Sequence, residues 1–191
     1  MSKRLQDKVA VITGAASGIG KGCANVLATE GATIAICDIN PNVTTVGRAI
    51  TSEHDVPVEA VITDVRSSTE VARFVENTIA QFGKIDILIN NAGIWRATPI
   101  TDSYEKVLDD FEAIVTTNLK GVFQVGRSVI PHMVEAGSGE IINIATSDII
   151  GEYSEMGKIG LHAWGNAEGY FKNLDVSVGM LVHFFLRFTT M

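Results

Sequence analysis

The chain has 191 residues, a length that corresponds to one compact domain rather than two. Apolar residues make up 46% and charged residues only 19%, which supplies a hydrophobic core and excludes the disordered and fibrous classes. Fifteen Lys and Arg against 22 Asp and Glu give a net charge of −7, so nucleic acid and anionic membranes are not expected partners.

Cysteine content and apolar segments bear on where the protein works. Cys23 and Cys37 are too few for a disulfide framework and are expected to be reduced. The N-terminus is charged and lacks the apolar segment of a secretory signal. The longest apolar-rich stretch, 176–188, is shorter than the roughly 20 residues of a membrane-spanning helix. A cytoplasmic protein is therefore expected.

Short β-branched runs alternate with longer amphipathic runs, a pattern typical of βαβ units and a parallel sheet. In chain order the predicted strands are 9–13, 32–37, 58–63, 85–90 and 140–145. The predicted helices are 19–30, 43–53, 68–82 and 118–135. Gly31, Gly83 and Gly137 each follow a helix and are predicted to end it with a positive φ. Pro131 predicts a kink or an early stop near Ile130.

After residue 175 apolar side chains alternate with others, as in a strand with one buried face. This pattern predicts a sixth strand beside the fifth. A hydrophobic helix and an unstructured end are the alternatives.

A glycine-rich turn, TGAASGIG at 13–20, lies between the first predicted strand and the first predicted helix. Its glycines are Gly14, Gly18 and Gly20. Such a turn lets the backbone approach a pyrophosphate and points the free N–H groups of the helix at it. The alternative is tight packing between the strand and the helix without any ligand.

Asp38 ends the second predicted strand, 18 positions after Gly20. An acidic residue at an offset of about 20 binds the adenosine ribose of NAD, and it would repel the 2′-phosphate of NADP. Position 17 is Ser rather than Arg or Lys, which also favours NAD. An ordinary turn residue at a strand end is the alternative role for Asp38.

Three further motifs follow in order: Asp64-Val65, then NNAG at 90–93, then Asn118 within TTNLKGVF. Together with the glycine turn, they make residues 6–147 resemble the short-chain dehydrogenase/reductase family. The resemblance implies an α/β fold with a Rossmann-type doubly wound parallel sheet and helices on both faces, shortened at the C-terminus. It implies one NAD-binding domain over 1–191, with a recognisable part at 1–147 and an atypical tail at 148–191. It also implies a homodimer or homotetramer.

In that family Asp64 and Val65 contact the adenine, while Asn91, Ala92 and Gly93 line the cofactor cleft. These segments follow predicted strands, at the edge where open α/β sheets bind ligands. The predicted cofactor-binding residues are Gly14, Ser17, Gly18, Ile19, Gly20, Asp38, Ile39, Asp64, Val65, Asn91, Ala92 and Gly93. No metal site is predicted.

The family's chemistry uses Ser, Tyr and Lys with a supporting Asn, and Asn118 matches that Asn, with helix capping as the alternative. Thr146 occupies the serine position, and Ser147 is an adjacent substitute. No Tyr-x-x-x-Lys follows Thr146, since Lys158 comes five residues after Tyr153, about 140° round a helix. A surface tyrosine is the alternative for Tyr153. The candidate catalytic residues are Asn118, Thr146, Ser147 and Tyr153.

Three hypotheses stay open from the sequence. The first is an NAD-dependent oxidoreductase that transfers a hydride between nicotinamide and a secondary alcohol or ketone. The second is a catalytically inactive or truncated NAD-binding protein of the same family. The third is a tail after about residue 150 that is not the native continuation, for instance through a shifted reading frame.

Overall fold

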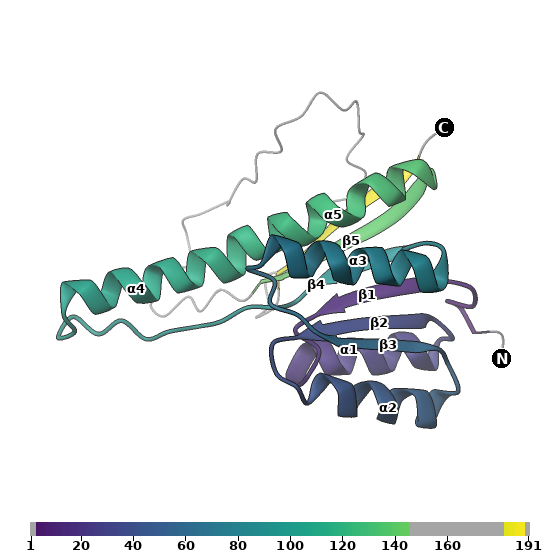
Figure 1. The fold of residues 1–191 in the computed structure, drawn as a ribbon, viewed down its shortest axis with the longest axis horizontal. Coiled ribbons are helices and arrows are strands. Elements are labelled where there is room, and N and C mark those ends of the chain that lie inside the picture. The colour runs from purple at the N-terminus through teal and green to yellow at the C-terminus, as the bar shows by residue number, and fades with distance from the viewer. Residues whose placement is uncertain (1–2, 146–181, 190–191) are drawn as a thin grey trace.

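The computed structural model describes residues 3–145 and 182–189 (Figure 1). Strands and helices alternate along the chain up to β5, which confirms the predicted α/β class. The strands are β1 Val9–Thr13, β2 Thr33–Asp38, β3 Val58–Ile62, β4 Ile87–Asn90, β5 Ser138–Ala145 and β6 Val182–Thr189. The helices are α1 Gly18–Thr29, α2 Val43–His54, α3 Ser68–Phe82, α4 Tyr104–Val115 and α5 Val122–Glu135, with a π-helical turn η1 at Thr116–Gly121.

The strands form one sheet in the order β3-β2-β1-β4-β5-β6. The first five are parallel, and Val11 of β1 pairs with both Ala35 of β2 and Leu88 of β4. The chain moves outward from β1 to β3 and then returns to place β4 on the other side of β1. The strand order therefore reverses between β1 and β4, and doubly wound sheets bind ligands outside the carboxyl ends of strands at such a point.

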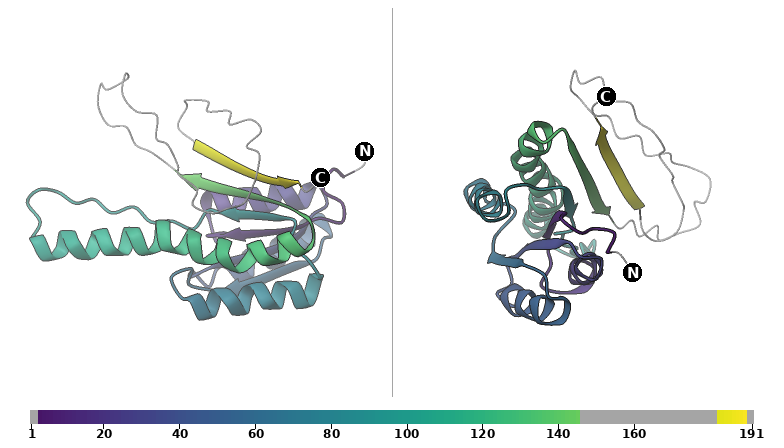
Figure 2. Two further views of the ribbon diagram at one scale, coloured as in Figure 1. Left: turned by 90° about the horizontal axis from the view of Figure 1, so that it is seen from above. Right: turned by 90° about the vertical axis from the view of Figure 1, so that its right-hand side faces the viewer.

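Helices cover both faces of the sheet, as predicted (Figures 1 and 2). Helices α1 and α2 pack on one face, where Ala24 and Ile50 belong to a buried apolar cluster. Helices α3 and α5 pack on the other face, where Phe74 and Met133 belong to a second cluster. Because β1 and β2 are buried on both sides, their sequences are nearly continuous apolar runs rather than alternations.

The predicted strand ends differ from the observed ones by at most two residues. Gly31, Gly83 and Gly137 have φ values of +90°, +79° and +70°, so the predicted positive-φ helix ends are confirmed. Each glycine adopts a conformation that would strain a residue with a Cβ.

The predicted start of the last helix is wrong, and so is the early stop, one of the two alternatives predicted at Pro131. The helix does not start at 118, because α4, η1 and α5 follow one another without a break from Tyr104. It also does not stop before Pro131, since α5 continues to Glu135. The ring removes one backbone donor, but Val129 and Met133 on either side are buried against the sheet and hold the turn in place.

The tail contributes a strand to the sheet over its described part. Strand β6 runs antiparallel to β5, with Ser138 paired to Thr189 and Ala145 paired to Val182. The strand alternative is therefore confirmed for residues 182–189. Residues 146–181 lie outside the described residues.

The structure also describes the two cysteines and the lengths of the helices. Cys23 and Cys37 are both free thiols, and Cys37 is buried. Within residues 3–145 and 182–189, no helix combines the length and apolarity needed to cross a membrane.

Candidate functional site

The predicted cofactor-binding residues gather at one edge of the sheet. The glycine turn follows β1, Asp38 ends β2, Asp64 follows β3, and Asn91 follows β4. These strands are parallel neighbours, so their carboxyl ends meet at the edge where the strand order reverses. The structure thus brings together residues that are up to 79 positions apart, such as Gly14 and Gly93.

Two of the three glycines are required by close backbone packing. A Cβ on Gly14 would lie 2.7 Å from the Cα of Ala92, and one on Gly20 would collide with the Gly14 carbonyl and the Asn91 amide. Gly14 also has a φ of +66°. At Gly14 and Gly20, glycine is therefore needed for tight packing between the strand and the helix, the alternative to ligand binding.

Gly18 has a different role, because nothing lies within 4 Å of where its Cβ would be. Its φ of +53° shapes the turn while leaving the surface above it open. Ser17 is the N-cap of α1, is exposed, and makes no capping bond with its side chain. Ile19 is 44% exposed in the first helical turn. The N-terminal N–H groups of α1 therefore face an open surface.

A clamp of four hydrogen bonds joins the ends of β1 and β4. The Thr13 hydroxyl accepts from the backbone N–H groups of Asn91 at 3.1 Å and Ala92 at 3.0 Å. The Asn91 side-chain amide donates to the carbonyls of Thr13 at 3.0 Å and Gly14 at 2.9 Å. Sequence reasoning missed Thr13, although a hydroxyl directly before a glycine turn was the available signal.

Asp38 links the end of β2 to the glycine turn. One carboxylate oxygen accepts from the Ala16 N–H at 2.9 Å, and the other accepts from the Asn40 N–H at 2.8 Å. The bond to Asn40 is the local turn role that is the alternative for Asp38, whereas the bond from Ala16 joins β2 to the turn after β1. Each oxygen has two lone pairs, so both retain capacity for a ribose hydroxyl. Ile39, the next residue, is 59% exposed.

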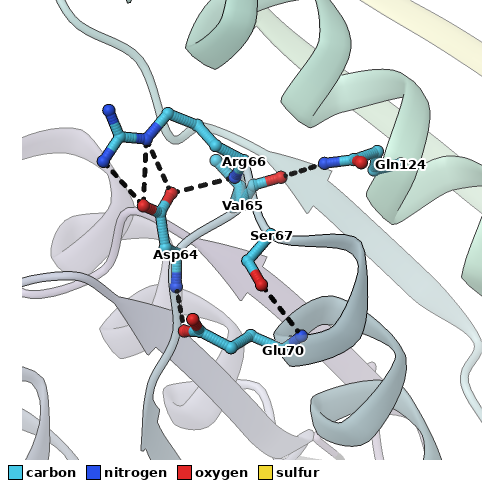
Figure 3. A network of polar contacts seen from close by, with 6 residues as sticks. All are labelled: Asp64, Val65, Arg66, Ser67, Glu70 and Gln124. Carbon is cyan, nitrogen blue, oxygen red and sulfur yellow. Dashed lines mark hydrogen bonds and ion pairs between the residues drawn. The ribbon is translucent and has the colours of Figure 1, made fainter.

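Asp64 lies in a polar network between β3 and α3 (Figure 3). Its carboxylate pairs with the Arg66 guanidinium at 2.7 Å, and this partner lowers the pKa of Asp64 below its usual value. Its backbone N–H donates to the Glu70 carboxylate at 2.9 Å. Sequence reasoning missed Arg66 and Glu70, because nothing in the motif marks the residues that support it.

Val65 is only 6% exposed and belongs to the second buried cluster. A Cβ on Gly121 would come within 2.9 Å of its side chain, so the two elements are in close contact. The Val65 carbonyl accepts from the Gln124 side chain of α5 at 2.7 Å. Val65 therefore anchors the segment after β3 to the second face of the sheet.

Asn118 lies within the π-helical turn rather than at a helix start, so the capping alternative is wrong. Its side-chain oxygen accepts from the Ile94 N–H, and its amide donates to the Ile94 carbonyl, both at 2.8 Å. Gly93 is in contact with this side chain. Asn118 thus fixes the loop that leaves β4. Thr146, Ser147 and Tyr153, the other candidate catalytic residues, lie outside the described residues.

The close packing of the glycine turn can be tested with two matched glycine-to-alanine substitutions. We expect Gly20→Ala to lower the free energy of unfolding by about 1–3 kcal/mol, because its methyl group overlaps backbone and Asn91. Gly22→Ala, two residues later in α1 with open space around it, is expected to raise it by about 0.5–1 kcal/mol. Urea unfolding measures both, and equal effects would contradict the packing role.

Comparisons with known proteins are consistent across sequence and structure. A model of the family described as short chain dehydrogenase matches residues 8–157. The chain is 36% identical to 3-oxoacyl-(acyl-carrier-protein) reductase FabG of Thermotoga maritima over 157 residues, which are 81% of this chain and 61% of that protein. It is 38% identical to D-threitol dehydrogenase of Mycolicibacterium smegmatis over 143 residues, which are 75% of this chain and 54% of that protein.

A solved structure, that of NAD⁺-bound xylitol dehydrogenase, matches with a TM-score of 0.68 and 35% identity. The match covers 74% of this chain and 54% of the other. The chain therefore spans only about half to two thirds of the length of these relatives, from 54% to 61%.

Proposed function

The chain belongs to the short-chain dehydrogenase family, and from this premise we propose that it is an NAD-dependent oxidoreductase. The proposed reaction is hydride transfer between nicotinamide and the carbon of a secondary alcohol or ketone. Its relatives include a reductase and a D-threitol dehydrogenase, which supports oxidoreductase chemistry on a small molecule.

One observation carries the proposal: the glycine turn, Asp38 and Asn91 form a single connected unit where the strand order reverses. Asn91 holds the turn from β4, and Asp38 holds it from β2 through Ala16. A mere packing role for the turn does not require a link to an acidic residue on the next strand. A bound dinucleotide requires this link, because its pyrophosphate must reach the glycine turn while its ribose reaches the acidic residue.

The residues present fit NAD. The open surface above Gly18 and the uncapped N–H groups of α1 suit a pyrophosphate, which favours the positive end of a helix dipole. Asp38 would accept hydrogen bonds from the ribose hydroxyls, and its charge disfavours a 2′-phosphate. The nicotinamide, when bound, would supply or accept the hydride.

The reacting end of the site would be arranged by the chain's own residues. Asn118 binds the backbone of Ile94 and so fixes the loop that follows Gly93, which would line the reacting end of the site. In the family pattern the Thr146 hydroxyl would bind the substrate oxygen, with Ser147 as its substitute. Tyr153 is the candidate proton donor.

Cofactor choice is tested at Asp38. We expect Asp38→Ala to weaken NADH binding about tenfold to a hundredfold, because hydrogen bonds to a carboxylate are lost. NADPH binding should weaken less or improve, since the repulsion is also removed. Energy transfer from the exposed Trp95 to the bound nicotinamide measures both dissociation constants. Asp109→Ala, on α4, is the control, and an unchanged NADH-to-NADPH ratio would contradict the assignment.

A non-catalytic cofactor-binding protein is the second candidate, and the missing Tyr-x-x-x-Lys favours it. The two are separated by mixing the protein with NAD and secondary alcohols, or with NADH and ketones, while recording the absorbance of NADH. Turnover supports the enzyme. NADH binding without turnover supports the second candidate, and the absence of NADH binding contradicts both.

We also expect a homodimer or homotetramer. Along the helix from α4 to α5, five large apolar side chains are exposed between 44% and 68%: Leu108, Phe111, Leu119, Phe123 and Val134. Exposed apolar side chains that lie along one helix are typical of a surface that is buried when subunits associate. Sedimentation velocity measures the assembly, and a monomer at micromolar concentration would contradict the expectation.

A further inference from the structure

We propose that Arg66 is a positioning residue for the adenine: its guanidinium holds the Asp64 carboxylate in place to accept a hydrogen bond from the adenine 6-amino group. The inference rests on the proposed function, because Asp64 is the residue expected to contact the adenine. It assigns a role to a side chain that lies next to the motif but does not belong to it.

Arg66 grips the Asp64 carboxylate with both its side chain and its main chain. The guanidinium Nε lies 3.0 Å from one carboxylate oxygen and 2.9 Å from the other, and Nη2 lies 2.7 Å from the second. The Arg66 backbone N–H also donates to the first oxygen at 2.9 Å. Figure 3 shows this arrangement, in which a planar guanidinium faces a planar carboxylate. Such paired, charge-assisted bonds fix orientation as well as position.

The carboxylate keeps room for a ligand. Two oxygens offer four lone-pair sites, whereas Arg66 brings three hydrogens to them, one from each of N, Nε and Nη2. One acceptor site is therefore left over. Among residues 3–145 and 182–189, Arg66 supplies all the hydrogen bonds to this carboxylate, so the orientation of the carboxylate depends on that one residue.

The backbone beneath the pair is held from both sides. The Asp64 N–H donates to Glu70 of α3, whose own N–H donates to the Ser67 hydroxyl at 3.3 Å. The Val65 carbonyl accepts from Gln124 of α5. With the main chain anchored in this way, the side-chain rotation of Asp64 is the main freedom left, and Arg66 restricts it.

The pair lies beside the proposed ribose acid. Asp38 of β2 pairs in register with Ile62 of β3, and the Asp38 carbonyl accepts from the Thr63 N–H at 3.0 Å. Asp38 and Asp64 therefore follow one another across neighbouring strands at the same edge of the sheet, where strands lie about 4.8 Å apart. The Arg66 guanidinium pairs with the Asp64 carboxylate and offsets its charge. Arg66 also lowers the pKa of Asp64, which keeps that group an acceptor.

The test compares two cofactors that differ at one group. NADH carries the adenine 6-amino group, and reduced nicotinamide hypoxanthine dinucleotide carries a carbonyl there. We expect the unaltered protein to bind NADH about tenfold more tightly than the analogue, the value of one hydrogen bond to a charged acceptor. In Arg66→Ala, NADH binding should weaken about tenfold while binding of the analogue changes little, so the preference disappears.

Matched variants separate positioning from general damage. Asp64→Ala should abolish the preference to the same extent, and the double variant should lose nothing further. Arg66→Lys keeps the charge but not the paired geometry, so it should restore only part of the preference. Arg48→Ala, in the middle of α2 beside Val58 and Ala60, removes a guanidinium away from this edge and should leave both affinities unchanged. Circular dichroism on each variant confirms that it is folded.

The outcomes test the positioning role of Arg66 separately from the proposed function on which it rests. If the unaltered protein does not bind NADH, the proposed function fails. If it binds NADH and Arg66→Ala keeps the preference for adenine, the positioning role fails and the function stands. If Arg66→Ala binds NADH more tightly, Arg66 competes with the adenine for Asp64, and the inference is overturned.

Discussion

The hydrogen bonds between Thr13 and Asn91 are the constraint on which the rest of the site depends. They join the ends of β1 and β4, two strands that are neighbours in the sheet but belong to its opposite halves. Because they draw the glycine turn against the β4 loop, no Cβ is tolerated at Gly14 or Gly20. Thr13 is 1% exposed, so these bonds are shielded from competing water. The turn is thereby shaped before any ligand arrives.

Much of the fold follows from local sequence. Strands 9–13 and 58–63 are short β-branched runs bounded by turns, and Gly31 and Gly83 mark helix ends that only positive φ can make. The helix α4 was missed although Ser103 caps it by accepting from the Lys106 N–H at 3.3 Å. Leu108 and Phe111 are exposed while Val107, Ile114 and Val115 are half-buried, so the sequence does carry the amphipathic pattern of a helix here.

The site was predictable only where a motif identifies its residues. Asp38 and Asn91 stand at motif positions, and the parallel sheet brings them together. Thr13 and Gln124 each contact a residue that is distant in sequence, and Arg66 contacts Asp64 from outside the motif, so no motif position identified these three residues. The 59 positions between Val65 and Gln124 are closed by the packing of α5 on the sheet, a tertiary effect.

The charges of the residues proposed to bind the adenosine bear on the choice between NAD and NADP. The chain carries a net charge of −7, and of the two acidic residues proposed to face the adenosine, Asp64 is paired with the Arg66 guanidinium. That guanidinium is directed at Asp64, and within residues 3–145 and 182–189 Asp38 forms no ion pair. A 2′-phosphate would add about two negative charges beside Asp38, whereas a ribose hydroxyl would donate a hydrogen bond to it. The charge of Asp38 is therefore the reason why we propose NAD rather than NADP as the cofactor.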